Sequence, residues 1–99
     1  MFNMNPAAVG ISAATETGIS IETAASTGAS MPALTGQVPM ANDLDSAMFA
    51  QVAVSSGAAY GAVATEHAAQ RGAYSAAQSL SAAATEASEA MTAAANTLG

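Results

Sequence analysis

The chain has 99 residues, of which 29 are alanine, and it contains neither cysteine nor tryptophan. Its net charge at pH 7 is −6 and it has a single Arg and no Lys, so it lacks the cations that would neutralise nucleic-acid phosphates or attract an anionic membrane. Only 22 residues are Val, Ile, Leu, Met, Phe or Tyr, which are too few to stabilise a thick core.

The first predicted element is a helix from about residue 6 to residue 30. Pro6 suits the first turn of a helix because its missing N–H would have no partner there, and Asn5 is a suitable N-cap. Pro32 is expected to end the helix, since a residue that precedes proline avoids the helical region. Several glycines and threonines make this helix intrinsically weak.

The bulky apolar residues of this segment, Val9, Ile11, Ile19 and Ile21, do not share one face of the helix. Ile19 and Ile21, for example, lie about 200° apart at 100° per residue. One antiparallel neighbour covers only one side of a helix, so part of this apolar surface would face water unless a second chain covers it. The sequence therefore predicts a partner.

A loop from about residue 31 to residue 42 follows, in which two prolines and a glycine act as helix breakers. A second helix is predicted from about residue 43 to residue 96, because no proline interrupts it. Asp43 and Asp45 are expected to cap its start and to complement the helix dipole.

These elements predict an all-α fold in a single domain of residues 1–99. Two-helix hairpins of this size are marginally stable alone, whereas a four-helix bundle buries both faces of each helix. The predicted architecture is therefore an antiparallel two-helix hairpin that completes a four-helix bundle with a partner protein.

Several apolar residues of the second helix, five of them bulky, fall within one stripe. Its members are Phe49, Val52, Ala53, Ala59, Tyr60, Val63 and Tyr74. Gly57 and Gly61 thin the same helix, which would let another helix lie close. A membrane span over residues 46–65 is a weaker interpretation, because no basic or tryptophan anchors flank it.

Side chains that could carry catalysis or bind a metal ion are scarce. His67 is the only candidate base for a Ser or Thr nucleophile, and one histidine with scattered carboxylates does not make a metal site. We therefore expect no enzyme activity, no cofactor and no metal. Glu16 and Glu66 are expected to be solvated or to pair with cations of another chain.

Two interpretations are open for the polar pair His67 and Arg71. The pair is either an exposed polar turn or part of the apolar stripe, where it would hydrogen-bond across an interface. The predicted partner interface combines bulky residues of both helices with the histidine. Its members are Val9, Ile11, Ile19, Ile21, Phe49, Val52, Tyr60, Val63, His67 and Tyr74.

Residues 38–46 (VPMANDLDS) resemble the loop and second-helix start of the mycobacterial Pro-Glu (PE) family, in which a Pro-containing turn leads to Asp and, three residues later, to Ser. Pro32 falls near the helix-ending proline of the family. Tyr60 lies 17 residues after Asp43, where many members carry a tyrosine. The resemblance covers almost the whole chain and is closest to the short, tail-less members encoded with type VII (ESX) secretion systems.

The resemblance implies a non-enzymatic protein that packs lengthwise on a PPE-family protein as a heterodimer and is exported with it by the type VII secretion machinery. The PPE partner of such pairs also binds a cytosolic chaperone. The implied location is cytoplasmic before export and then secreted or at the cell surface. This route would explain why the first residues lack the basic start and apolar run of a secretory signal peptide.

Two positions depart from the family pattern. The Pro-Glu pair that names the family is Pro6-Ala7 in this chain. The export signal of the family, Tyr-x-x-x-Asp/Glu after the second helix, falls on Thr85 and Glu89, so the acid is present and the tyrosine is not. Thr85 and Glu89 are therefore predicted to form a degenerate secretion signal.

The alternative prediction is a homo-oligomeric structural protein, such as a filament subunit or a WxG-like secreted helical dimer. Such a protein would need no second gene product. A membrane-active peptide rich in alanine and glycine is a third possibility.

Overall fold

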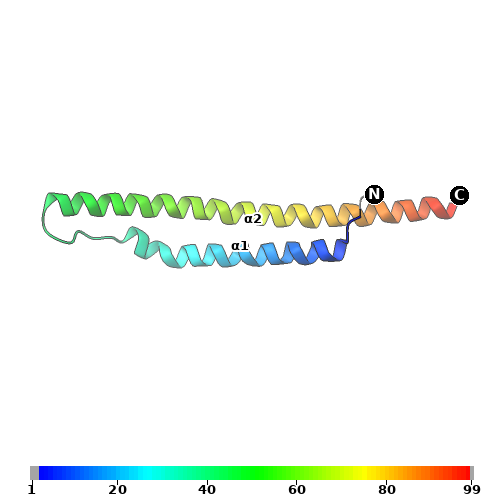
Figure 1. Ribbon diagram of the computed structural model, residues 1–99, viewed down its shortest axis with the longest axis horizontal. Coiled ribbons are helices and arrows are strands. Elements are labelled where there is room, and N and C mark those ends of the chain that lie inside the picture. Colours follow the sequence, from blue (N-terminus) through cyan, green and yellow to red (C-terminus); the bar gives the residue numbers. More distant parts are fainter. Residues whose placement is uncertain (1–2, 99) are drawn as a thin grey trace. The chain divides into compact units, whose positions relative to one another are not determined.

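The computed structural model describes residues 3–98, and over this range the chain forms two α-helices and no strand. Helix α1 spans Pro6–Thr35 and helix α2 spans Leu44–Leu98, with residues 36–43 joining them (Figure 1). The fold is therefore all-α, and its two helices form a helical hairpin, as the sequence predicts.

The start of α1 is fixed by the cap that the sequence predicts. The side-chain oxygen of Asn5 accepts hydrogen bonds from the N–H groups of Ala7 and Ala8 at 3.1 and 3.3 Å. The carbonyl of Asn5 accepts the N–H of Val9 at 3.1 Å. Pro6 occupies the first position of the helix, where no N–H is required.

The prediction that α1 ends before Pro32 is wrong, because the helix continues through Pro32 to Thr35. The last turn is closed by the N–H of Gly36, which donates to the Pro32 carbonyl at 2.9 Å. Proline costs the helix one backbone hydrogen bond, but the extra turn brings Met31 and Leu34 against α2. This tertiary packing outweighs the local preference of proline.

The start of α2 is capped by Asp43, as predicted. Its carboxylate accepts the backbone N–H of Ser46 at 2.7 Å and the Ser46 hydroxyl at 3.1 Å. These bonds, the backbone one first, lower the pKa of the Asp43 carboxyl below its ordinary value. Asp45 lies in the first turn, near the positive end of the helix dipole. The Asp–Ser spacing that carries the family resemblance therefore also forms a helix cap.

Helix α2 continues without interruption through its glycines to Leu98, close to the predicted end at residue 96. Every described residue beyond Thr85 is exposed. The last turns of α2 are therefore not covered by any other described part of the chain.

Packing between the helices divides the chain into two compact units. The first unit, called here the loop unit, contains residues 20–69. The second, called here the terminal unit, joins the described residues up to 19 with those from 70 onward. Each unit thus contains a segment of α1 packed on a segment of α2.

Small side chains form the helix interface of the loop unit. Thr27, Ala50 and Ala68 are buried there, and the hydroxyl of Ser20 donates to the Ala68 carbonyl at 2.7 Å. No described side chain of the protein is both large and fully buried. Packing in this unit therefore depends on close approach of the helices.

Two glycines of α2 make that close approach possible in the loop unit. A Cβ atom on Gly57 would overlap the backbone carbonyl of Leu34, and one on Gly61 would overlap the thioether of Met31. The prediction that these glycines let another helix lie close is confirmed, and the helix is α1.

The helix interface of the terminal unit is more polar. The buried Ser75 hydroxyl lies 2.6 Å from the Ala13 carbonyl and 2.5 Å from the Thr17 hydroxyl. Gln78 donates from its side-chain nitrogen to the Ser12 hydroxyl at 3.0 Å. These bonds pair the buried Ser75 hydroxyl with α1 and fix the register of the two segments, whereas the buried side-chain oxygen of Gln78 has no hydrogen-bond partner in the described range.

The buried positions of α2 recur every seven residues, which is the spacing of a helix packed along another helix. One series is Ala50, Gly57, Ala64, Arg71, Gln78 and Thr85, and the other is Val54, Gly61, Ala68, Ser75 and Ala82. All of these residues are buried or half-buried. We call them the buried seam, and most of its members are small or polar.

Candidate partner-binding surface

Most large apolar side chains of α2 lie outside the buried seam, in which Val54 is the one large apolar residue. In the loop unit they are, besides Leu44 and Met48 near the start of α2, the four residues Phe49, Val52, Tyr60 and Val63, each of them more than half exposed. We call these four residues the exposed stripe. Tyr74, in the terminal unit, is exposed to a similar extent. The structure thus leaves the bulkiest residues of α2 in solvent.

The exposed stripe has a regular relation to the buried seam. Phe49, Tyr60 and Val63 each directly precede a seam residue, so each lies about 100° around the helix from the seam. Positions 49, 53, 56, 60, 63 and 67 are separated alternately by four and three residues. Phe49, Tyr60 and Val63 occupy three of these positions and Ala53, Ser56 and His67 the other three, so large apolar residues fill half of this side of the helix.

The bulky residues of α1 point in different directions, as the sequence predicts. Val9 and Ile19 are half-buried, whereas Ile11 and Ile21 are exposed. Helix α1 therefore keeps apolar side chains both inside and outside its contact with α2. Their inclusion in a partner interface stays a prediction.

His67 and Arg71, one helical turn apart on α2, have different environments. His67 is exposed, at a position that continues the spacing of the stripe. Arg71 lies in the buried seam of the terminal unit, where its guanidinium donates to the Glu16 carboxylate at 3.2 Å. The prediction that Glu16 is solvated or pairs with another chain is wrong, because the packing of α1 on α2 places it opposite Arg71.

The predicted secretion-signal residues Thr85 and Glu89 both lie within α2. Thr85 is half-buried and Glu89 is exposed. Their separation of one helical turn places them on the same side of the helix. Their role in export stays a prediction.

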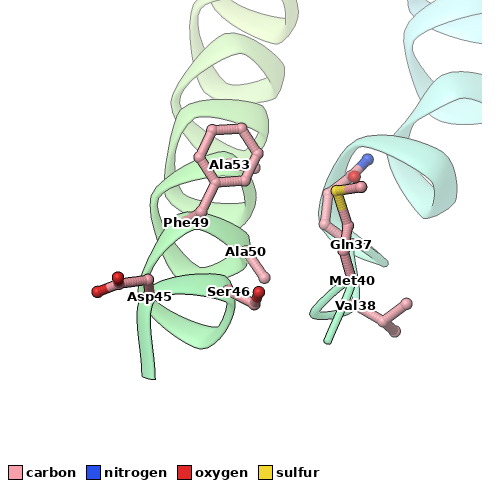
Figure 2. A pocket seen from close by; sticks show the side chains of 8 residues that line it. All are labelled: Gln37, Val38, Met40, Asp45, Ser46, Phe49, Ala50 and Ala53. Carbon is pink, nitrogen blue, oxygen red and sulfur yellow. The ribbon is translucent and has the colours of Figure 1, made fainter. Parts of the chain in front are cut away.

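A cavity of about 390 Å³ lies in the loop unit beside the exposed stripe (Figure 2). Its walls are Val38 and Met40 of the connection and Ser46, Phe49, Ala50 and Ala53 of α2. Gln37 and Asp45 add polar groups at its rim. We call it the loop cavity. Phe49 belongs both to this cavity and to the exposed stripe.

Figure 2 shows the loop side chains of Gln37, Val38 and Met40 opposite the first turns of α2, with Asp45 pointing away from them. This cavity was not predicted from the sequence, because the residues of the connection were interpreted only as helix breakers. The signal available was the pair of apolar residues on either side of Pro39, close in sequence to Phe49.

Other kinds of site were also sought in the structure. Within residues 3–98, no group of three or more His, Asp or Glu side chains could hold a metal ion. In the same range, α2 is the one helix long and apolar enough to cross a membrane, with a mean hydropathy of 1.3 over its best 18-residue window. Helices of soluble proteins pass the same test, so this property does not define a site.

The comparisons with known proteins identify no relative. No protein-family model, no curated protein and no solved structure matches the chain. Inference about function therefore depends on the residues of the chain itself.

Proposed function

We propose that this chain is a non-enzymatic helical hairpin that binds a helical partner protein and completes a four-helix bundle with it. One observation carries the proposal: α2 places mostly small or polar residues against α1 and leaves most of its large apolar residues in solvent. Exposed apolar residues grouped along one side of a helix are typical of a surface that another protein covers.

The energy available from such a partner is substantial. Burying one large apolar side chain contributes roughly 1.5–3 kcal/mol, and the exposed stripe has four such residues within residues 49–63. Inside the hairpin, by contrast, the buried apolar residues are alanines, each of which contributes far less. The hairpin is therefore expected to gain much of its stability from the partner.

The resemblance to the PE family supports a PPE-family protein as this partner. It also supports export of the pair by the type VII secretion machinery, with a cytosolic chaperone bound through the partner, and a secreted or cell-surface location after export. Because Asp43 and Ser46 also form a helix cap, the exposed stripe carries the proposal more strongly than this motif does.

A second copy of the chain is a less suitable occupant of the stripe. Each copy has a net charge of −6, so two copies repel each other when they come together. A partner with more basic residues meets no such repulsion. The net charge of the chain therefore favours a heterodimer over the homo-oligomeric alternative.

The test is to express the chain alone and together with a PPE-family protein. We expect the lone chain to be weakly helical or self-associated, and the pair to elute as a 1:1 complex with increased helix by circular dichroism. Light scattering gives the masses. A monomeric lone chain with a cooperative melt and no complex would contradict the proposal, and a stable homo-oligomer of the lone chain would favour the alternative.

The proposed export signal needs a separate test, because binding and export are distinct steps. Glu89→Ala is expected to reduce secretion of the complex, whereas Glu86→Ala serves as the matched control on the same exposed segment of α2. Equal secretion of both variants would remove the signal assignment and leave the partner proposal intact.

A further inference from the structure

We propose that the loop cavity is the socket for one large apolar side chain of the partner helix, and that a lysine or arginine about one turn away on that helix pairs with Asp45. This inference rests on the proposed function, because it concerns the same partner. It adds the chemistry by which one end of the interface recognises that partner.

The loop cavity is large enough for an apolar anchor, and its lining suits one. Its volume of about 390 Å³ is at the small end of the range of roughly 300–1,000 Å³ found for ligand pockets. Val38, Met40 and Phe49 provide large apolar walls, and Ala50 and Ala53 keep the floor open. Anchors of this kind, buried in a pocket, supply most of the binding energy at many protein interfaces.

The loop cavity is continuous with the exposed stripe. Phe49 lines the cavity and also begins the stripe, which ends at Val63. Fourteen residues of helix extend about 21 Å at 1.5 Å per residue, a length that one ordinary partner helix covers. A helix lying along the stripe therefore reaches the cavity without a bend or a second binding segment.

The negative charge of Asp45 beside the loop cavity calls for a positive charge on the partner. Asp45 lies one turn before Phe49, and its carboxylate has no hydrogen bond or ion pair with any residue in the range 3–98. The neighbouring Asp43 carboxylate is already engaged by Ser46. Asp45 is thus the acid available to a partner at this end of α2.

A cation for Asp45 has to come from another molecule. The chain has no lysine, and its single arginine, Arg71, pairs with Glu16 in the terminal unit. A second copy of the chain would bring the same deficit of cations. A helix with an apolar anchor and a nearby lysine or arginine complements both the cavity and its rim.

The absence of cysteine from the sequence allows a direct test in the complex with the co-expressed partner. Val38→Cys places a thiol in the cavity wall, and Leu44→Cys places one outside it; the two wild-type residues have matched exposures of 75% and 73%. Alkylation by iodoacetamide is then followed by mass spectrometry. We expect the partner to slow the reaction at position 38 by about tenfold or more, since a filled pocket excludes reagent, and to change it little at position 44.

The charge is tested by measuring affinity for the same partner with Asp45→Asn and with Glu86→Gln as a control for the loss of one negative charge. We expect Asp45→Asn to weaken binding about threefold at low salt, which is the scale of an exposed ion pair, and to have no effect near 1 M salt. Glu86→Gln should bind as the wild type does.

The outcomes separate the two proposals. A complex in which position 38 reacts as fast as in the lone chain, or in which both charge variants behave alike, overturns the inference and leaves the proposed function standing. Protection of position 38 by self-association alone identifies a second copy as the occupant and also overturns it. Failure to form any complex overturns the proposed function and this inference together.

Discussion

Neighbouring residues on the two sides of α2 have opposite environments. Phe49 is 71% exposed, while Ala50, the next residue, is 7% exposed. The same holds for Tyr60 beside the buried Gly61. At both places the helix turns a small residue towards α1 and a large one away from it.

This contrast shows that the two sides of α2 have different roles. Small residues on the buried seam let the helices approach closely and exchange hydrogen bonds, as Ser20 does with the Ala68 carbonyl. Large residues on the exposed stripe stay available for a partner. If the hairpin were the complete folded protein, Phe49 and Val63 would be expected inside it.

The largest effect is expected from a substitution on the exposed stripe, measured as loss of partner binding. Val63→Asp would place a carboxylate in an apolar contact, where burying an unpaired charge costs several kcal/mol. We expect complex formation to be abolished in co-purification, while the helix content of the lone chain is unchanged because Val63 is 68% exposed. Ala62→Asp is the control, since this exposed residue lies on neither the seam nor the stripe. Normal binding of Val63→Asp would show that the stripe is not the interface.

The next largest effect is expected from a substitution in the buried seam, measured as a loss of stability. Gly57→Ala forces a Cβ into the backbone carbonyl of Leu34, and such overpacking costs about 1–3 kcal/mol. Gly61→Ala is the matched variant, because it meets only the flexible end of Met31 and gains about 0.5–1 kcal/mol of helix propensity. Urea unfolding of the complex should show Gly57→Ala as clearly the less stable of the two. Equal stability would mean that the helices do not approach as closely as described.

A smaller effect is expected from removing the ion pair between the two helices of the terminal unit. Glu16 and Arg71 form an ion pair whose side chains are 24% and 36% exposed, so solvent screens it. A double-mutant cycle with Glu16→Gln and Arg71→Gln should give a coupling free energy of about 0.2–1 kcal/mol that decreases with salt. A coupling of zero at low salt would remove the pair from the interactions that hold this unit.

The smallest effect concerns the Asp43 cap. Because hydrogen bonds from Ser46 lower the pKa of Asp43 below its ordinary value of 3.8, the stabilisation is present above that pH and is lost as the pH falls through the lower folded-state value. The Ser46 amide signal in NMR should therefore change only below about pH 4. Asp43→Asn keeps a cap without a titrating group and should not show this change. A midpoint above 4 in the wild type would contradict the cap geometry.

The helix starts could be predicted from the sequence because their signals are local. Asn5 and Asp43 cap the helices they precede, with hydrogen bonds to residues two or three positions later. The end of α1 could not be predicted in this way. It depends on the packing of Met31 and Leu34 against glycines of α2, which are far away in sequence.

The buried seam was not recognised in the sequence for a related reason. A search for apolar periodicity finds bulky residues, and it found the stripe of Phe49, Tyr60 and Val63. The seam consists of alanine, glycine and polar residues, so only the seven-residue recurrence of small residues would have revealed it. The pairing of Glu16 with Arg71 was missed as well, because it follows from the register of α1 on α2.

The central claim is that the large residues of α2 await a partner. Hydroxyl-radical footprinting of the chain alone and in the complex tests it most directly, because the method reports side-chain exposure of Phe49 and Tyr60 individually. We expect both residues to oxidise readily in the lone chain and their oxidation to become several-fold slower in the complex. Unchanged oxidation of both residues in a complex of defined mass would contradict it.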